Sequence, residues 1–174
     1  VVIRQRKTDF TKLCQRVEML ISEALDRNMK IENYSCEKNK YTLKLKEIER
    51  YTVSCSYISI PKKGEIQCGD SVVHGKISGG KYAVILSDGM GCGKEASEQS
   101  ITAIELMQQF LNAGFNKKTS VEMINSALML KNSETFATLD ATVVDLFTAN
   151  TEFIKAGANT TYIKTGKCIK KISS

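Results

Sequence analysis

The chain contains the run Tyr82-Ala83-Val84-Ile85-Leu86-Ser87-Asp88-Gly89-Met90-Gly91-Cys92-Gly93-Lys94. Its first five residues are apolar, and three of them are β-branched or aromatic, which predicts a buried strand. The strand ends on an aspartate, and a turn with three glycines leads into a long helical pattern. Such a turn places a carboxylate at the open end of a sheet, beside backbone that no bulky side chain covers. A hard metal ion or a phosphate would fit there.

Two phosphate-binding interpretations compete for this turn. A Walker phosphate loop requires G-x-x-x-x-G-K-[ST], but Asp88 stands at the first glycine position and Glu95 follows Lys94. A dinucleotide fingerprint fits better, because residues 91–96 read G-x-G-x-x-A after a strand. That motif also requires a second strand after one helix. Here two helical stretches follow, and the next strand is expected only near Ala137, which disfavours a dinucleotide.

The third interpretation treats Asp88 and Gly89 as a pair of metal ligands, through the carboxylate and the backbone carbonyl. Oxygen ligands suit Mg²⁺ and Mn²⁺, and such ions polarise phosphate and activate water. Asp70, which opens another expected strand after Gly69, is the second candidate acid. The residues alone leave the dinucleotide and metal interpretations open, with the metal interpretation favoured.

The same motifs resemble those of the PP2C-like (PPM) family of metal-dependent serine/threonine phosphatases. The likeness is closest to the phosphatase domain of the stage II sporulation protein E branch and runs in order from about Gly64 to the end. The motifs that carry it are Ser87-Asp88-Gly89-Met90-Gly91, Gly69-Asp70-Ser71, Thr138-Leu139-Asp140 and Lys155-Ala156-Gly157-Ala158. The resemblance implies a layered α/β/β/α sandwich, of which this chain would form a part.

The resemblance also implies an activity and a site. Asp88 and Asp70 would be the catalytic acids, and Asp88, Gly89 and Asp70 would bind Mn²⁺ or Mg²⁺, with two ions in the complete domain. Metal-activated water would hydrolyse phosphoserine on an anti-sigma factor antagonist, a step in sporulation and sigma factor regulation. The helices after the Asp-Gly turn would correspond to the family's regulatory elements.

The chain departs from the family pattern at its C-terminal end. The family completes its metal site with aspartates on later strands, whereas no aspartate follows Asp145 here and Glu152 is the last acid. The sequence leaves open whether the chain is a fragment of such an enzyme. The alternative is a catalytically incomplete phosphatase-like module that binds a partner without turnover.

Composition favours an ordinary globular protein of the cytoplasm. The chain has 174 residues, of which 42% are hydrophobic, and six widely spaced cysteines without a C-x-x-C pair. This spacing predicts neither a zinc site nor a disulfide framework. The net charge of +6 comes from scattered lysines without an aromatic platform, so no nucleic-acid partner is expected. No apolar run has the length of a membrane helix, although full-length members of the resembling family are membrane-anchored.

The expected organisation is α+β, with a lead-in segment over residues 1–60 and the phosphatase-like core over 61–174. The lead-in should contain an amphipathic helix from Thr8 to Arg27, which also offers a face for a homodimer, and strands at 29–36, 41–48 and 51–58. The core should contain a hairpin of strands 71–76 and 81–87, then helices over 94–112 and from a capping box at Thr119 to about Leu130. Further strands are expected at 138–147, 152–156 and 161–165.

Three other residues receive structural rather than catalytic roles. Asp140 lies within an apolar strand, so an inward-facing carboxylate would need a partner. Asp145 is five residues further along the same strand and should point to the opposite face. His74 is the sole histidine and is expected on a strand surface, which argues against histidine-based metal chemistry.

Overall fold

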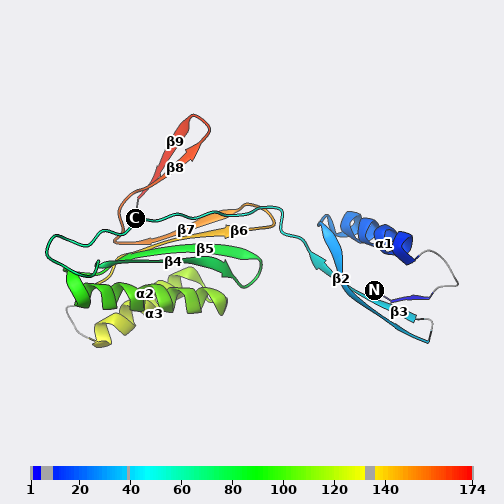
Figure 1. Cartoon of the computed structure of the whole chain (residues 1–174), viewed down its shortest axis with the longest axis horizontal. Coiled ribbons are helices and arrows are strands. Elements are labelled where there is room, and N and C mark those ends of the chain that lie inside the picture. The colour runs from blue at the N-terminus through cyan, green and yellow to red at the C-terminus, as the bar shows by residue number, and fades with distance from the viewer. Residues whose placement is uncertain (1, 5–9, 39, 132–135, 174) are drawn as a thin grey trace. The chain divides into compact units, whose positions relative to one another are not determined.

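The computed structural model describes residues 2–4, 10–38, 40–131 and 136–173 (Figure 1). They divide into two compact units, Val1–Arg50 and Tyr51–Ser174. Each unit has its own sheet and its own buried residues, and each is described separately below.

The first unit is one helix packed on a three-stranded antiparallel sheet with the strand order β1-β3-β2. Its elements are β1 (Val2–Arg4), α1 (Phe10–Leu25), β2 (Met29–Glu37) and β3 (Lys40–Glu47). Leu43 is almost fully buried, and the Phe10 ring lies 4.8 Å from the rings of both Tyr34 and Tyr41. The expected helix and the strands at 29–36 and 41–48 are confirmed, while Thr8 lies outside the described residues.

The second unit is built on a four-stranded antiparallel sheet with the order β4-β5-β6-β7. Its strands are β4 (Asp70–Ile77), β5 (Lys81–Asp88), β6 (Leu139–Asp145) and β7 (Thr151–Ala156). The expected hairpin is confirmed, and its turn contains Gly79 and Gly80 at positive φ. A Cβ at Gly80 would lie 2.1 Å from the Phe147 ring, so the turn needs glycine there.

Two helices cover one face of this sheet (Figure 1). They are α2 (Gly93–Asn112) and α3 (Lys117–Lys131). The core between the helices and the sheet consists mainly of aliphatic side chains, among them Ile85, Ile104, Met107, Leu128 and Ala141. A sheet with helices on one side confirms the α+β layered architecture.

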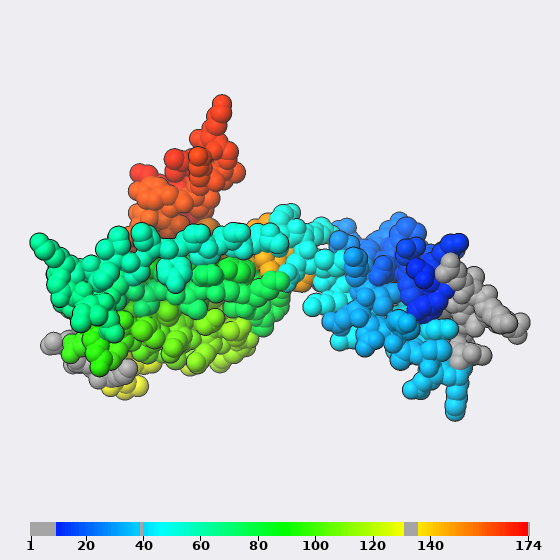
Figure 2. Space-filling model, viewed as in Figure 1, coloured from blue at the N-terminus to red at the C-terminus, as the bar shows by residue number. Residues whose placement is uncertain are grey.

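The structure corrects two expectations about the elements and adds β1 and β9, which the sequence analysis did not predict. Residues 51–58 form no strand; they run across the surface of the second unit (Figure 2), where the backbone N–H of Tyr51 donates to Leu146. Helix α3 begins at Lys117 rather than at the Thr119 capping box, because the Asn116 side chain accepts from the N–H of Lys118. After β8 (Thr161–Thr165) comes β9 (Cys168–Ile172), which the sequence analysis missed.

No helix among the described residues is long and apolar enough to cross a membrane.

Candidate metal and active site

Two carboxylates meet at one end of the four-stranded sheet. Asp70 is the first residue of β4 and Asp88 the last of β5, and the antiparallel register places them directly opposite each other. Side chains alternate along a strand, so both aspartates lie on the face opposite Ile85, which is buried in the core under the helices. Like charges at directly opposed positions are unfavourable. The sheet thus creates a local excess of negative charge that a cation would neutralise.

The surroundings of Asp88 oppose ionisation. Partial burial, then a hydrogen bond with Asp70 and the negative charge of Asp70, raise the pKa of the Asp88 carboxyl above its usual value of 3.8. Asp88 remains exposed enough for a cation to reach it. The positive charge of a bound cation would offset the negative charge of Asp70 and thereby lower the pKa of Asp88 again.

Gly89 is required by the approach of α2. A Cβ at this position would lie 1.9 Å from the backbone oxygen of Ala96 in the first part of the helix. At Gly69 a Cβ would lie 3.1 Å from the Cβ of Ala96, and the N–H of Gly89 donates to the Gly69 carbonyl at 3.2 Å. The two glycines therefore let the helix backbone close over the ends of β4 and β5, beside the aspartates.

The turn after Gly89 is held by contacts that the sequence analysis did not identify. The N–H of Met90 donates to the carbonyl of Phe136 and to the side chain of Gln99. The Cys92 thiol, 3.4 Å from Glu65, donates to its carboxylate. Gly91 and Gly93 have φ of 97° and 73°, which favour glycine. Of the residues that shape this turn, only the glycines were identified from the sequence.

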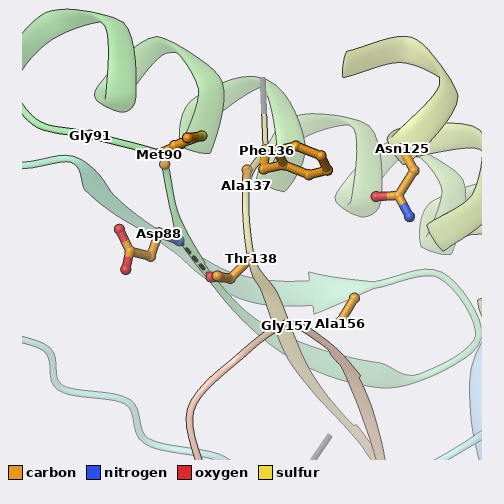
Figure 3. A pocket seen from close by; sticks show the side chains of 10 residues that line it. Asp88, Met90, Gly91, Asn125, Phe136, Ala137, Thr138, Ala156 and Gly157 are labelled. Carbon is orange, nitrogen blue, oxygen red and sulfur yellow. Dashed lines mark hydrogen bonds between the residues drawn. The ribbon is translucent and has the colours of Figure 1, made fainter. Parts of the chain in front are cut away.

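Thr138 fixes the backbone of Asp88 from the neighbouring strand edge. The N–H of Asp88 donates to Thr138 Oγ1 at 3.0 Å, the N–H of Thr138 donates back to the Asp88 carbonyl at 2.9 Å, and the Ser87 hydroxyl donates to the Thr138 carbonyl. In Figure 3 the Asp88 carboxylate points away from Thr138. The threonine therefore orients the strand end and leaves the carboxylate free to bind. The Thr-Leu-Asp motif contained this residue, but the sequence gave it no role.

A cavity of about 490 Å³ adjoins the Asp-Gly turn. Figure 3 shows its walls, to which α3 contributes Asn125 and the end of β7 contributes Ala156 and Gly157. The backbone of residues 88–91 and residues 136–138 form the remaining sides. The cavity therefore lies between the backbone of the Asp-Gly turn, helix α3 and the end of β7, and the Asp88 carboxylate points away from its walls in Figure 3.

Asp140 is a structural acid, as the sequence analysis expected, and Asp145 is held by the backbone of the turn that follows it. Asp140 pairs with Lys155 across β6 and β7, and Thr161 donates to it at 2.9 Å. Asp145 accepts from the N–H groups of Phe147 and Thr148 at 2.9 Å each. Partial burial raises the pKa of Asp145, but these hydrogen bonds outweigh it and bring the pKa below 3.8. His74 lies on β4, with Nδ1 2.7 Å from the Tyr82 hydroxyl oxygen.

The donor set fits a hard divalent cation only in part. Asp70 and Asp88 offer carboxylate oxygens and Gly89 a backbone carbonyl, which are ligands that Mg²⁺ and Mn²⁺ prefer. Over the residues that the structure describes, however, no group of three or more His, Cys, Asp or Glu side chains could hold a metal ion. These residues supply one carboxylate pair, which is fewer ligands than a centre of two ions requires.

Comparison with known proteins identifies similar chains. A family model described as Stage II sporulation protein E (SpoIIE) matches residues 78–173. The stage II sporulation protein E of Priestia megaterium is 37% identical over 125 residues, which are 71% of this chain and 21% of that protein. This chain spans about a fifth of the length of the curated relatives it matches.

Solved structures of similar proteins identify the fold. The structure of the PP2C phosphatase domain and a fragment of the regulatory domain of SpoIIE from Bacillus subtilis matches with a TM-score of 0.78 and 26% identity, covering 99% of this chain and 51% of that chain. A structure of RsbX in complex with magnesium matches with a TM-score of 0.50 and 22% identity, covering 60% of this chain and 49% of that chain. The fold is therefore a partial PP2C-like fold.

Proposed function

Because this chain belongs to the stage II sporulation protein E family, we propose that it carries part of the catalytic domain of a metal-dependent protein serine/threonine phosphatase. The observation that carries the proposal is the cross-strand pair of Asp70 and Asp88 at the end of the sheet. Two facing carboxylates at directly opposed positions are unfavourable without a cation.

Asp70, Asp88 and the carbonyl of Gly89 would hold Mg²⁺ or Mn²⁺. A bound divalent cation supplies Lewis-acid activation of water and of the phosphate ester. The carboxylates keep the cation at the sheet end, and Thr138 fixes the backbone from which Asp88 projects. Gly89 lets the first turn of α2 approach this end of the sheet closely.

The finer features of this proposal rest on likeness to family members. The magnesium in the RsbX structure supports a divalent cation, and a second ion would require ligands beyond the described carboxylate pair. The substrate class we propose is a phosphoserine protein, an anti-sigma factor antagonist in sporulation control, acted on in the cytoplasm. Association of two copies of the chain is also proposed, through the exposed part of α1.

Release of phosphate from a phosphoserine protein, measured with and without Mn²⁺, tests the activity. The wild-type chain should release phosphate only with the metal, and Asp88→Asn should reduce the rate by about a hundredfold or more. Asp145→Asn is the matched control, because this aspartate ends β6 opposite Lys81, at the other end of the sheet from the pair, and it should retain the rate. Metal-independent release, or an active Asp88→Asn variant, would contradict the proposal.

A second function is favoured by the incomplete donor set of the described residues. The chain would then be a phosphatase-like module that binds a phosphoprotein without hydrolysing it. Binding and turnover measured on one sample separate the two functions: a module of this kind would retain a phosphoserine protein on a column without releasing phosphate.

A further inference from the structure

A buried polar cluster lies on three consecutive strands of the second unit. Lys155 on β7 donates from Nζ to Asp140 Oδ2 on β6 at 2.5 Å and to Thr161 Oγ1 on β8 at 2.8 Å. Thr161 in turn donates to the same Asp140 oxygen at 2.9 Å. The Lys155 side chain is 4% exposed and that of Asp140 17%. All three side chains are thus joined to one another within a largely dry environment.

The cluster lies on the same sheet face as the candidate metal ligands. Leu86 pairs with Asp140, and Asp140 pairs with Lys155, so these residues form one row across the sheet. Asp88 is two residues after Leu86 on β5, and its side chain therefore lies on the same face, one row further along. Asp140 is a diagonal neighbour of Asp88, at a separation of roughly 7–8 Å. Because Lys155 neutralises Asp140, this third acid adds little negative charge to the pair.

The cluster also closes the loop that follows β7. Lys155 precedes this loop and Thr161 begins β8, so their hydrogen bond joins the two ends of residues 156–160. Among the described strands β8 pairs only with β9, which leaves Thr161 as a polar connection between this ribbon and the four-stranded sheet. Gly157 belongs to the loop closed in this way, Ala156 is the last residue of β7 before it, and both line the cavity described above.

Stability alone does not account for such a cluster. Burying an ion pair carries a large desolvation cost, and apolar residues of similar volume often stabilise a fold equally well. What the ionic cluster adds is a fixed geometry, since hydrogen bonds are directional and each of these partners has few alternatives. The element whose geometry it fixes is the loop that forms the cavity wall.

We propose that Asp140, Lys155 and Thr161 form a positioning element that holds the loop after β7 beside the sheet end that carries Asp70 and Asp88, and thereby determines how a phosphorylated protein is seated there. This inference rests on the proposed function. None of the three residues touches the reacting phosphate: they act through Ala156 and Gly157, which contribute shape rather than chemistry. A phosphorylated protein contacts this loop, whereas a small phosphate ester contacts only the metal site formed by Asp70 and Asp88.

Thr161→Val tests the proposal most cleanly, because it removes one hydroxyl and leaves the Lys155–Asp140 pair in place. Thr161→Ser restores the hydroxyl, and Thr165→Val makes the same change at an exposed position of the same strand. Hydrogen exchange of the amides of residues 158–160 is measured without metal or substrate. Mn²⁺-dependent hydrolysis is measured with phosphocasein and with p-nitrophenyl phosphate.

We expect Thr161→Val to accelerate exchange in the loop and to raise KM for phosphocasein by about tenfold, with little change in kcat for p-nitrophenyl phosphate. Thr161→Ser and Thr165→Val should resemble the wild type. The inference is overturned if Thr161→Val exchanges like Thr165→Val, or if kcat falls equally for both substrates while KM is unchanged. If the wild-type chain hydrolyses neither substrate, the proposed phosphatase activity fails, and the exchange comparison still decides whether the cluster positions the loop.

Discussion

Individual carboxylates in this chain have opposite roles because their immediate neighbours differ. Asp88 faces another carboxylate, and the pKa of its carboxyl is raised. Asp145 accepts two backbone N–H groups, and Asp140 is paired with a buried lysine. Only the first arrangement leaves negative charge uncompensated. An aspartate that the fold leaves in an unfavourable state is a better candidate for ligand binding than one whose charge is satisfied.

The raised pKa of Asp88 predicts how the metal-free chain responds to pH. Between the ordinary value of 3.8 and the raised value, the folded state binds more protons than the unfolded state, so the free energy of unfolding falls as pH rises through this window. At neutral pH in EDTA, Asp88→Asn should therefore increase the free energy of unfolding, by about 0.5 kcal/mol.

Urea denaturation of both proteins measures this difference. It should vanish well below pH 3.8, where the wild-type carboxyl is protonated in both states. Saturating Mn²⁺ should reverse the order, because only the wild type gains stability from binding. A metal-free Asp88→Asn variant that is less stable than the wild type at neutral pH would contradict the repulsion between the two aspartates.

The ion pair of Asp140 and Lys155 predicts strong coupling between these residues. Lys155→Met should lower the free energy of unfolding by about 3 kcal/mol, because it leaves a buried carboxylate without a partner. Combining it with Asp140→Leu should recover most of this loss. Urea denaturation of the two single variants and the double variant completes the cycle, and additive effects would show that the pair is not coupled.

At the scale of elements, the site depends on how closely α2 approaches the ends of β4 and β5. Gly89 has no room for a methyl group because the backbone of Ala96 lies against it. Gly91 is required for a different reason. A Cβ at Gly91 would meet nothing within 4 Å, but the φ of 97° is a backbone conformation that favours glycine.

Gly89→Ala should therefore lower the free energy of unfolding by about 3 kcal/mol, since α2 must move to accommodate the added methyl group. Gly91→Ala is the control, and its backbone strain alone should cost about 1 kcal/mol. Thermal unfolding followed by circular dichroism compares the two variants. Equal effects would mean that the contact with Ala96 does not set the position of the helix.

The sequence predicted those elements whose signals are local. The hairpin of β4 and β5 and helix α2 were identified because alternation, turn glycines and helical periodicity all lie within a short window. The alternation of Tyr51, Val53, Cys55 and Tyr57 predicted a strand that the structure lacks, because such a pattern reports a preference for extended backbone and not the presence of a partner strand. The start of α3 was missed since Asn116 and the Thr119 box are competing caps.

The candidate site was predictable only where a motif carried it. Asp70, Asp88 and Gly89 were identified, and the structure brings them together. The roles of Thr138 and of the Lys155–Thr161 contact depend on hydrogen bonds between segments distant in sequence, for which no periodic signal exists. These contacts are specified by tertiary packing.

At the scale of the whole molecule, the chain consists of two units with separate cores. Leu43 is buried in the first unit and Ile85 in the second, and the described site residues all lie in the second. Domains with their own cores unfold as separate cooperative units unless their interface is extensive.

Calorimetry of the whole chain should therefore show two transitions. Leu43→Ala should lower the melting temperature of one, and Ile85→Ala that of the other, each through a loss of about 2–5 kcal/mol. A single transition that both variants shift equally would show that the two units unfold together.

Binding of Mn²⁺ to the intact chain, followed by electron paramagnetic resonance, tests the central claim that Asp70 and Asp88 form a cation site. The account predicts that the wild type and Asp145→Asn deplete the signal of free Mn²⁺ alike, and that Asp70→Asn and Asp88→Asn each weaken this binding by about tenfold or more. Equal Mn²⁺ binding by the wild type and by Asp88→Asn would contradict it.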